Sequence, residues 1–163
     1  MPPGQFLIWF QGESVQRSAM NQIVRQATGD TPPVRQLYDV SGISGVFRQA
    51  REREPGLTLL LLSTADGRAV AEDSVLGVDG RRLAAMANSF LTLGETVSRE
   101  LALSEADYAT VCTRQGNVVL IRVHGEKPMT LTAVAGADIN MAALLFHARE
   151  CASRLQAVLR TNA

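Results

Sequence analysis

The stretch 57–73, LTLLLLSTADGRAVAED, constrains the fold of this chain more than any other. Its four consecutive leucines, 59–62, predict a strand that other elements cover on both faces, which places it in the interior of a sheet. The pair Asp66-Gly67 predicts a tight reversal into a second strand over 69–73. The chain is therefore expected to build its sheet around an antiparallel hairpin.

Helical segments flank this hairpin. One helix is predicted to begin near Ser41, a residue type that caps helices well, and to stop at the EPG sequence at 54–56. The longest helix is predicted over about 81–103, with Asp79 near its start, where a carboxylate favours the free N–H groups. The final helix is predicted to run from near Asn140 to about Arg160.

The long helix carries two different apolar faces. Large side chains spaced three or four residues apart predict the face that packs in the core. They are Leu83, Met86, Phe90, Leu93, Val97 and Leu101. The second face holds small or flat residues, namely Ala84, Ala87, Leu91 and Gly94. Packing beneath a sheet and a helix–helix dimer contact explain this second face equally well.

Three further strands are predicted over 108–113, 117–123 and 130–135. The element order is then helix, two strands, long helix, three strands and helix, with short connections. Because hairpins join antiparallel strands without a crossover, the sheet is expected to be largely antiparallel and covered by helices. The predicted fold class is α/β of the α+β type.

The first forty residues differ from the rest. We expect residues 1–40 to be an extension with one amphipathic helix over 13–27, and residues 41–161 to form the main domain. The apolar face of that helix either covers the main domain or docks on a partner. The apolar run FLIWF at 6–10 is too short for a signal-peptide core followed by a cleavage site, and no stretch approaches the roughly twenty apolar residues of a membrane span. We expect a cytoplasmic protein that does not bind membranes.

Charge and cysteine content limit the classes of function that the chain can have. The formal net charge is zero, which gives no basic field for nucleic acid. The two cysteines, Cys112 and Cys151, are expected to be free thiols.

Motifs for catalysis are not found in the sequence. It has no phosphate-binding loop, no G-x-G-x-x-G after a strand and no G-x-S-x-G nucleophile elbow. His147 and Cys151 have the i,i+4 spacing of metal ligands, but Cys151 lies on the apolar side of the last helix, and the further ligand candidates Cys112 and His124 are scattered. We expect no catalytic residues, no metal and no cofactor, and a protein built to present surfaces.

The order of elements from 41 to 160 resembles the roadblock/dynein light chain family. The likeness is carried by GLTLLLLSTADGRAVAED, by the Ala-rich LAAMANSFLTLGETVSREL, and by VLIRV followed by TLTAVAGADINMAALLFHARECASRL. The resemblance implies a five-stranded antiparallel sheet with the long helix on one face and the first and last helices on the other, a roadblock/profilin-like arrangement. The hairpin would supply an inner strand and an edge strand.

The resemblance also implies a function. Family members are adaptors or regulators of small Ras-like GTPases, and they typically dimerise through the long helix and the third strand. It thus implies a homodimer contact by Ala84, Ala87, Leu91, Gly94, Tyr108 and Thr110, and GTPase docking by Arg81, Arg82, Asn88, Glu95 and Arg99. The arginine-rich composition, with Lys127 as the only lysine, suits the bacterial regulator type.

Three alternatives stay open from the sequence. Solvated charges at the helix ends or on an exposed face are the simpler explanation of the arginines of the long helix. A scaffold would tether partners without changing GTP turnover. A small-molecule sensor would have a pocket between the sheet and the long helix, lined by a few convergent polar groups.

Overall fold

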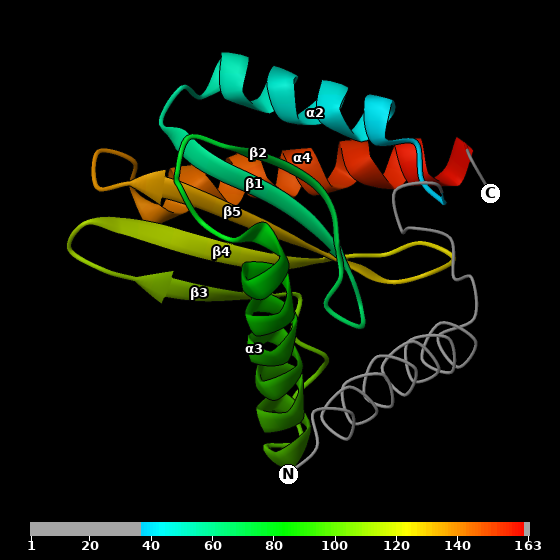
Figure 1. Ribbon diagram of the computed structural model, residues 1–163. Coiled ribbons are helices and arrows are strands. Elements are labelled where there is room, and N and C mark those ends of the chain that lie inside the picture. Colours follow the sequence, from blue (N-terminus) through cyan, green and yellow to red (C-terminus); the bar gives the residue numbers. More distant parts are fainter. Residues whose placement is uncertain (1–36, 162–163) are drawn as a thin grey trace, which may run out of the picture. The chain divides into compact units, whose positions relative to one another are not determined.

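The computed structural model describes residues 37–161, so the helix expected over 13–27 lies outside the described residues. A five-stranded sheet has the order β2-β1-β5-β4-β3, and every neighbouring pair is antiparallel. Helices α2 and α4 cover one face of this sheet and α3 lies on the other (Figure 1). The elements are α2 (Val40–Arg53), β1 (Leu57–Thr64), β2 (Ala69–Ser74), α3 (Gly80–Glu100), β3 (Tyr108–Cys112), β4 (Gly116–Val123), β5 (Met129–Gly136) and α4 (Met141–Thr161).

The leucine run forms the interior strand that the sequence predicts. β1 lies between β2 and β5, and all four leucines are fully buried. Because successive side chains of a strand point to opposite faces, Leu60 and Leu62 join the core beneath α2 and α4, whereas Leu59 and Leu61 face α3. The expected inner strand and edge strand of the hairpin are confirmed as β1 and β2.

The turn between these strands packs directly against α3. Gly67 has a φ of +80°, and a Cβ added there would lie 3.0 Å from the Cα of Ala85. Only glycine avoids both the left-handed strain and this backbone contact. Next to it, hydrogen bonding from the Thr64 hydroxyl, helped by the nearby Arg68 guanidinium, lowers the pKa of Asp66 below its ordinary value.

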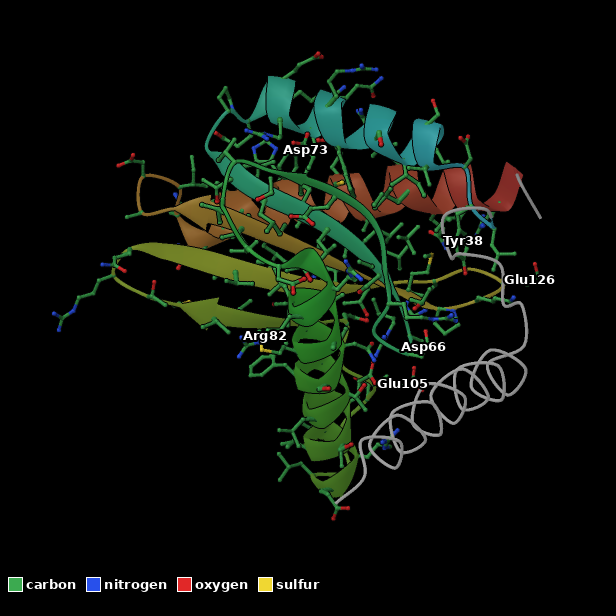
Figure 2. The ribbon with its side chains drawn as sticks, in the orientation of Figure 1. Tyr38, Asp66, Asp73, Arg82, Glu105 and Glu126 are labelled. Carbon is green, nitrogen blue, oxygen red and sulfur yellow. The ribbon has the colours of Figure 1, made fainter. Side chains whose placement is uncertain are left out.

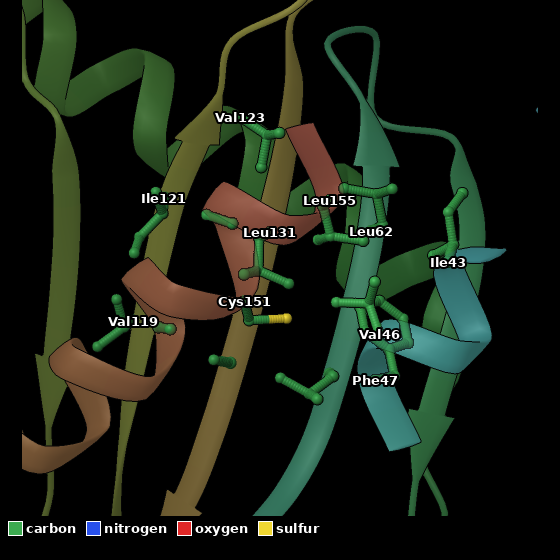
Figure 3. Packing of buried hydrophobic residues seen from close by; sticks show 14 of the residues in the cluster. Ile43, Val46, Phe47, Leu62, Val119, Ile121, Val123, Leu131, Cys151 and Leu155 are labelled. Atoms are coloured by element: carbon green, nitrogen blue, oxygen red, sulfur yellow. The ribbon is translucent and has the colours of Figure 1, made fainter. Parts of the chain in front are cut away.

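The two helical layers differ in how much they bury. On one face, large side chains of α2, α4 and the sheet form an extensive core, seen close by in Figure 3. Ile43, Phe47 and Leu155 are fully buried there, and each such side chain contributes about 1.5–3 kcal/mol of hydrophobic stabilisation. On the other face the buried cluster is small, with Leu59, Leu61 and Ala84 at its centre. Most of the hydrophobic stabilisation therefore comes from the α2/α4 layer.

One helix boundary differs slightly from the sequence-based expectation. α2 begins at Val40, one residue before Ser41, and its cap is Asp39, whose carboxylate accepts a hydrogen bond of 2.9 Å from the backbone N–H of Gly42. Asp79 caps α3 as expected, accepting from the backbone N–H groups of Arg81 and Arg82. At the other end of α3, Ala102 has a φ of 55°, the left-handed conformation that closes many helices.

Candidate functional site: the exposed face of helix α3

The faces of α3 are reversed relative to the prediction from periodicity. The small-residue face is the one that packs on the sheet, with Ala84 and Leu91 fully buried and Ala87 nearly so. The sheet already supplies large side chains, such as Leu59 and Leu61, so the helix sits close to it only if its own residues are small. These three residues are therefore covered by their own chain, and their burial does not favour the dimer contact expected for them.

The large apolar residues of α3 face outward. The expectation that they pack in the core is wrong for most of the set, because Met86, Phe90, Leu93, Val97 and Leu101 are between 44% and 65% exposed. Leu83 alone among them is partly buried against the sheet. We call the five exposed residues the α3 stripe. A monomer rarely leaves such a row of apolar side chains in water unless the surface has a partner.

An open strand edge accompanies the stripe. β3 is the last strand of the sheet and pairs with β4 only. Within the described part of the chain its outer backbone edge has no strand beside it, which makes it a template for pairing with another chain. Thr110, expected at a dimer contact, is exposed here, and the ring of Tyr108 lies 5.1 Å from the guanidinium carbon of Arg149. Of the other expected contact residues, Gly94 of α3 is half-buried.

A polar network fixes α3 on the sheet. Arg122 of β4 donates to Glu95 through Nε at 3.0 Å and Nη2 at 2.7 Å, and through Nη1 to Asn88 at 3.1 Å and Thr130 at 2.9 Å. The amide of Asn88 also donates to the carbonyl of Ala65 in the β1–β2 turn. Asn88 and Glu95 are thus engaged within their own chain, which does not favour the partner-binding role expected for them.

The sequence analysis did not find Arg122. The signal was one charged residue inside the otherwise apolar strand VVLIRV, but its partners are distant in sequence and only the fold brings them together. Thr132, on the same sheet face, is fully buried, and its hydroxyl has no hydrogen-bond partner among the described residues. A buried threonine of this kind has no distinguishing mark in the sequence.

The arginines expected to meet a partner lie at the two ends of α3. Arg81 and Arg82 are exposed at its start, and Arg99 is exposed at its end. Nη2 of Arg99 donates a hydrogen bond of 3.3 Å to the Thr96 hydroxyl. Figure 2 shows Arg82 and Asp66 on opposite sides of α3. These arginines are accessible to a partner, in contrast to Asn88.

A polar cavity lies between the end of α3 and the sheet. Its volume is about 240 Å³, and charged side chains from α3, from the segment before β3 and from the end of β4 line it. They include Arg99, Glu105, Asp107, Arg122 and His124. This is the place where a sensor domain was expected to have its pocket.

Within the described residues, those weighed as metal ligands or nucleophiles do not form one cluster. Cys151 is buried in the α4 core, and this burial raises the pKa of its thiol to about 12. His147 faces Glu54 of the segment after α2 at 3.6 Å. Cys112 is an exposed free thiol on β3. Among residues 37–161, no three histidine, cysteine or acidic side chains are grouped as a metal ion needs, and no helix has the length and apolar character to cross a bilayer.

The comparison with solved structures decides the fold. No protein-family model matches the sequence, and no curated protein matches it. Myxococcus xanthus MglB superposes with a TM-score of 0.67 at 9% identity, over 77% of this chain and 92% of that one. A roadblock/LC7 domain from Streptomyces avermitilis gives a TM-score of 0.61 at 16% identity, over 74% and 96%. The chain has a roadblock fold.

A third solved structure matches this chain over a similar range. An MglB structure with a tetrameric arrangement has a TM-score of 0.66 at 16% identity, over 76% of this chain and 92% of that one. The expected roadblock recognition and the α+β architecture are therefore confirmed. At such identities the likeness concerns the fold alone, so the site is argued from this chain's own residues.

Proposed function

We propose that this roadblock-fold chain is a non-enzymatic, self-associating regulator or adaptor of a small Ras-like GTPase. One observation carries the proposal: the α3 stripe is exposed beside the open edge of β3. Together they offer an apolar helix face and unpaired backbone groups, the two features that a second copy of the chain would cover. The neighbours named MglB, one of them a gliding protein of Thermus thermophilus and another in a tetrameric arrangement, support a regulatory and self-associating role.

The proposed mechanism is a population shift in the GTPase. A dimer joined along α3 presents the outer sides of two long helices as one surface, with Arg81, Arg82 and Arg99 at its ends. Arginine is enriched at interfaces and pairs with acidic groups, so these side chains suit contact with a GTPase switch segment. Binding to one arrangement of that segment stabilises it, which changes turnover only if that arrangement hydrolyses GTP faster.

Turnover of GTP by the small Ras-like GTPases of the source organism tests this role. With saturating wild-type chain we expect faster turnover of the cognate GTPase, and with Phe90→Glu we expect most of this effect to be lost. Thr92→Glu is the matched control, because it adds the same charge at an exposed position off the stripe. Binding without any change in turnover would favour the scaffold, and failure to bind any of these GTPases would refute the proposal.

A second candidate function rests on the polar cavity. Its lining supplies several converging charged groups from α3 and from the sheet, which is one feature of a small-molecule site. A charged ligand there would contact Arg99 and Glu105 and so raise the melting temperature, which Arg99→Ala would abolish. A thermal-shift screen with charged metabolites in which none shifts the wild type would remove this candidate.

A further inference from the structure

The polar cavity at the end of α3 collects charges of both signs from three parts of the chain. Arg99 comes from α3, Glu105 and Asp107 come from the segment before β3, and Arg122 comes from β4. Its volume of about 240 Å³ equals that of about eight water molecules in the liquid. A ligand of roughly the size of an amino acid therefore has room there.

One pair of charges in this lining is already satisfied. The Arg122 side chain is 11% exposed, and its guanidinium donates to Glu95 through two nitrogens and to Asn88 and Thr130 through the third. Glu95, which also lines the cavity, balances the charge of Arg122. These two residues therefore form a wall of the cavity with no net charge.

The remaining charged groups of the lining are not satisfied in this way. Arg99, Glu105 and Asp107 are exposed, and none of them belongs to an ion pair within the described part of the chain. Arg99 makes one hydrogen bond, to the Thr96 hydroxyl, and has further N–H donors. One guanidinium and two carboxylates thus line the cavity without a charged partner.

The backbone holds these three groups around the cavity. After α3 the chain turns at Ala102, whose φ is 55°, and the N–H of Leu103 donates to the Ser98 carbonyl at 2.9 Å. A hydrogen bond of 3.4 Å from the N–H of Arg122 to the Asp107 carbonyl joins the other end of the segment to β4. Glu105 lies between these two attachments and beside α3 (Figure 2). The charges are therefore carried by a segment fixed at both ends, which is what a preformed site requires.

The balance of unpaired charges defines the class of ligand. A molecule that pairs with all three groups carries two cationic groups and one carboxylate, because guanidinium groups bind carboxylates well and carboxylates bind ammonium or guanidinium groups. A dicarboxylate would meet Glu105 and Asp107 with charge of their own sign. A diamine would leave Arg99 unpaired and be repelled by it. A basic amino acid has the required set, with its α-ammonium, its cationic side chain and its α-carboxylate.

We propose that the polar cavity binds a free basic amino acid, such as lysine, ornithine or arginine. The α-carboxylate pairs with Arg99, and the two cationic groups pair with Glu105 and Asp107. The inference rests on the second candidate function, the small-molecule sensor, and names the class of its ligand. It does not depend on regulation of a GTPase.

Titration of the ¹⁵N-labelled full chain with lysine or arginine, followed by nuclear magnetic resonance, tests the proposal. We expect a dissociation constant of about 1 mM or tighter, with the largest shifts at the amides around the cavity. Glu105→Gln or Asp107→Asn should raise that constant about tenfold, because each removes one charge-assisted contact. Glu100→Gln is the matched control, since it neutralises an exposed carboxylate next to Arg99 that does not line the cavity. The same spectra report whether each variant is folded.

Cadaverine, which is lysine without its carboxylate, tests the contact assigned to Arg99. Arg99→Gln should weaken lysine binding about tenfold and leave cadaverine binding unchanged or tighter, because Arg99 attracts a carboxylate and repels an amine. Equal weakening of both ligands would refute the proposed pairing of Arg99 with the carboxylate.

The other outcomes separate this inference from the sensor function itself. If no basic amino acid shifts the amides around the cavity at concentrations well above the expected dissociation constant, the proposal is overturned. If glutamate or another charged metabolite binds there instead, the sensor stands and the basic amino acid is refuted. If Glu100→Gln weakens binding as much as Glu105→Gln does, the ligand is not held by the cavity and the proposed site is wrong.

Discussion

Shortening two leucines that lie two positions apart on α3 should change the unfolding free energy by very different amounts. Leu91 is fully buried against the sheet, whereas Leu93 is 61% exposed on the stripe. The substitutions Leu91→Ala and Leu93→Ala remove the same atoms from the same helix and leave helix propensity equally improved. The difference between the two variants therefore reports only which face of α3 is covered by the chain itself.

The expected magnitudes are far apart. Truncating a fully buried leucine removes its transfer free energy and leaves a cavity, which costs about 2–5 kcal/mol of unfolding free energy. Truncating an exposed leucine changes that free energy by about 0.5 kcal/mol or less. With an m-value of about 2 kcal/mol per molar urea, the first change lowers the unfolding midpoint by roughly 1–2.5 M and the second by a few tenths.

Urea unfolding followed by circular dichroism measures both variants. The protein must be dilute enough that wild type and variants are monomers by light scattering, since dimerisation itself adds stability. At higher concentration Leu93→Ala should weaken self-association instead. Equal losses of monomer stability, or a larger loss for Leu93→Ala, would refute the assignment of the two faces.

Three further predictions concern single residues of the fold. Thr132→Val removes a buried hydroxyl that has no partner among the described residues, so it should leave the unfolding free energy unchanged or raise it by about 1 kcal/mol. Thr130→Val removes a buried hydroxyl that is hydrogen-bonded, so it should lower the unfolding free energy by about 1–3 kcal/mol. Urea unfolding measures both changes. Ala102→Gly should raise the melting temperature by relieving the left-handed strain, a gain of about 0.5–1 kcal/mol, and Gly67→Ala should lower it. The buried thiol of Cys151 has a raised pKa of about 12, so the thiol ionises in the unfolded chain before it does in the folded one. Between pH 8 and 10 wild type should therefore lose about 1–2 kcal/mol more stability than Cys151→Ala.

Each of these has a result that contradicts it. Equal effects of the two threonine variants would mean that the hydroxyls have the same environment. A lower melting temperature for Ala102→Gly would show that the end of α3 is not left-handed in solution. Identical alkaline stability curves for wild type and Cys151→Ala would show that the thiol is solvated in the folded state.

The sequence was sufficient for the sheet because local signals there agree with the fold. The leucine run must be covered by other elements on both faces of the sheet, and the Asp66-Gly67 turn makes β2 pair antiparallel with β1. The prediction that the large apolar residues of α3 pack in the core was wrong for a physical reason. Periodicity reports that a helix has apolar faces, but the contour of the sheet beneath decides which face it accepts, and a sheet surface already filled by Leu59 and Leu61 accepts alanines.

The polar network under α3 was beyond the sequence for another reason. Arg122 stabilises the position of α3 through Glu95, Asn88 and Thr130, which come from distant parts of the chain. No local pattern links these residues, because their contacts form only when the helix lies across the sheet.

The molar mass of the full chain in solution tests the central claim most directly. Light scattering at tens of micromolar protein should give twice the 17.6 kDa of one chain for wild type and for Thr92→Glu, and a value close to one chain for Phe90→Glu. That result would establish the α3 stripe as the surface at which two copies meet. A wild-type mass of one chain, or a dimer that Phe90→Glu leaves intact, would contradict the account.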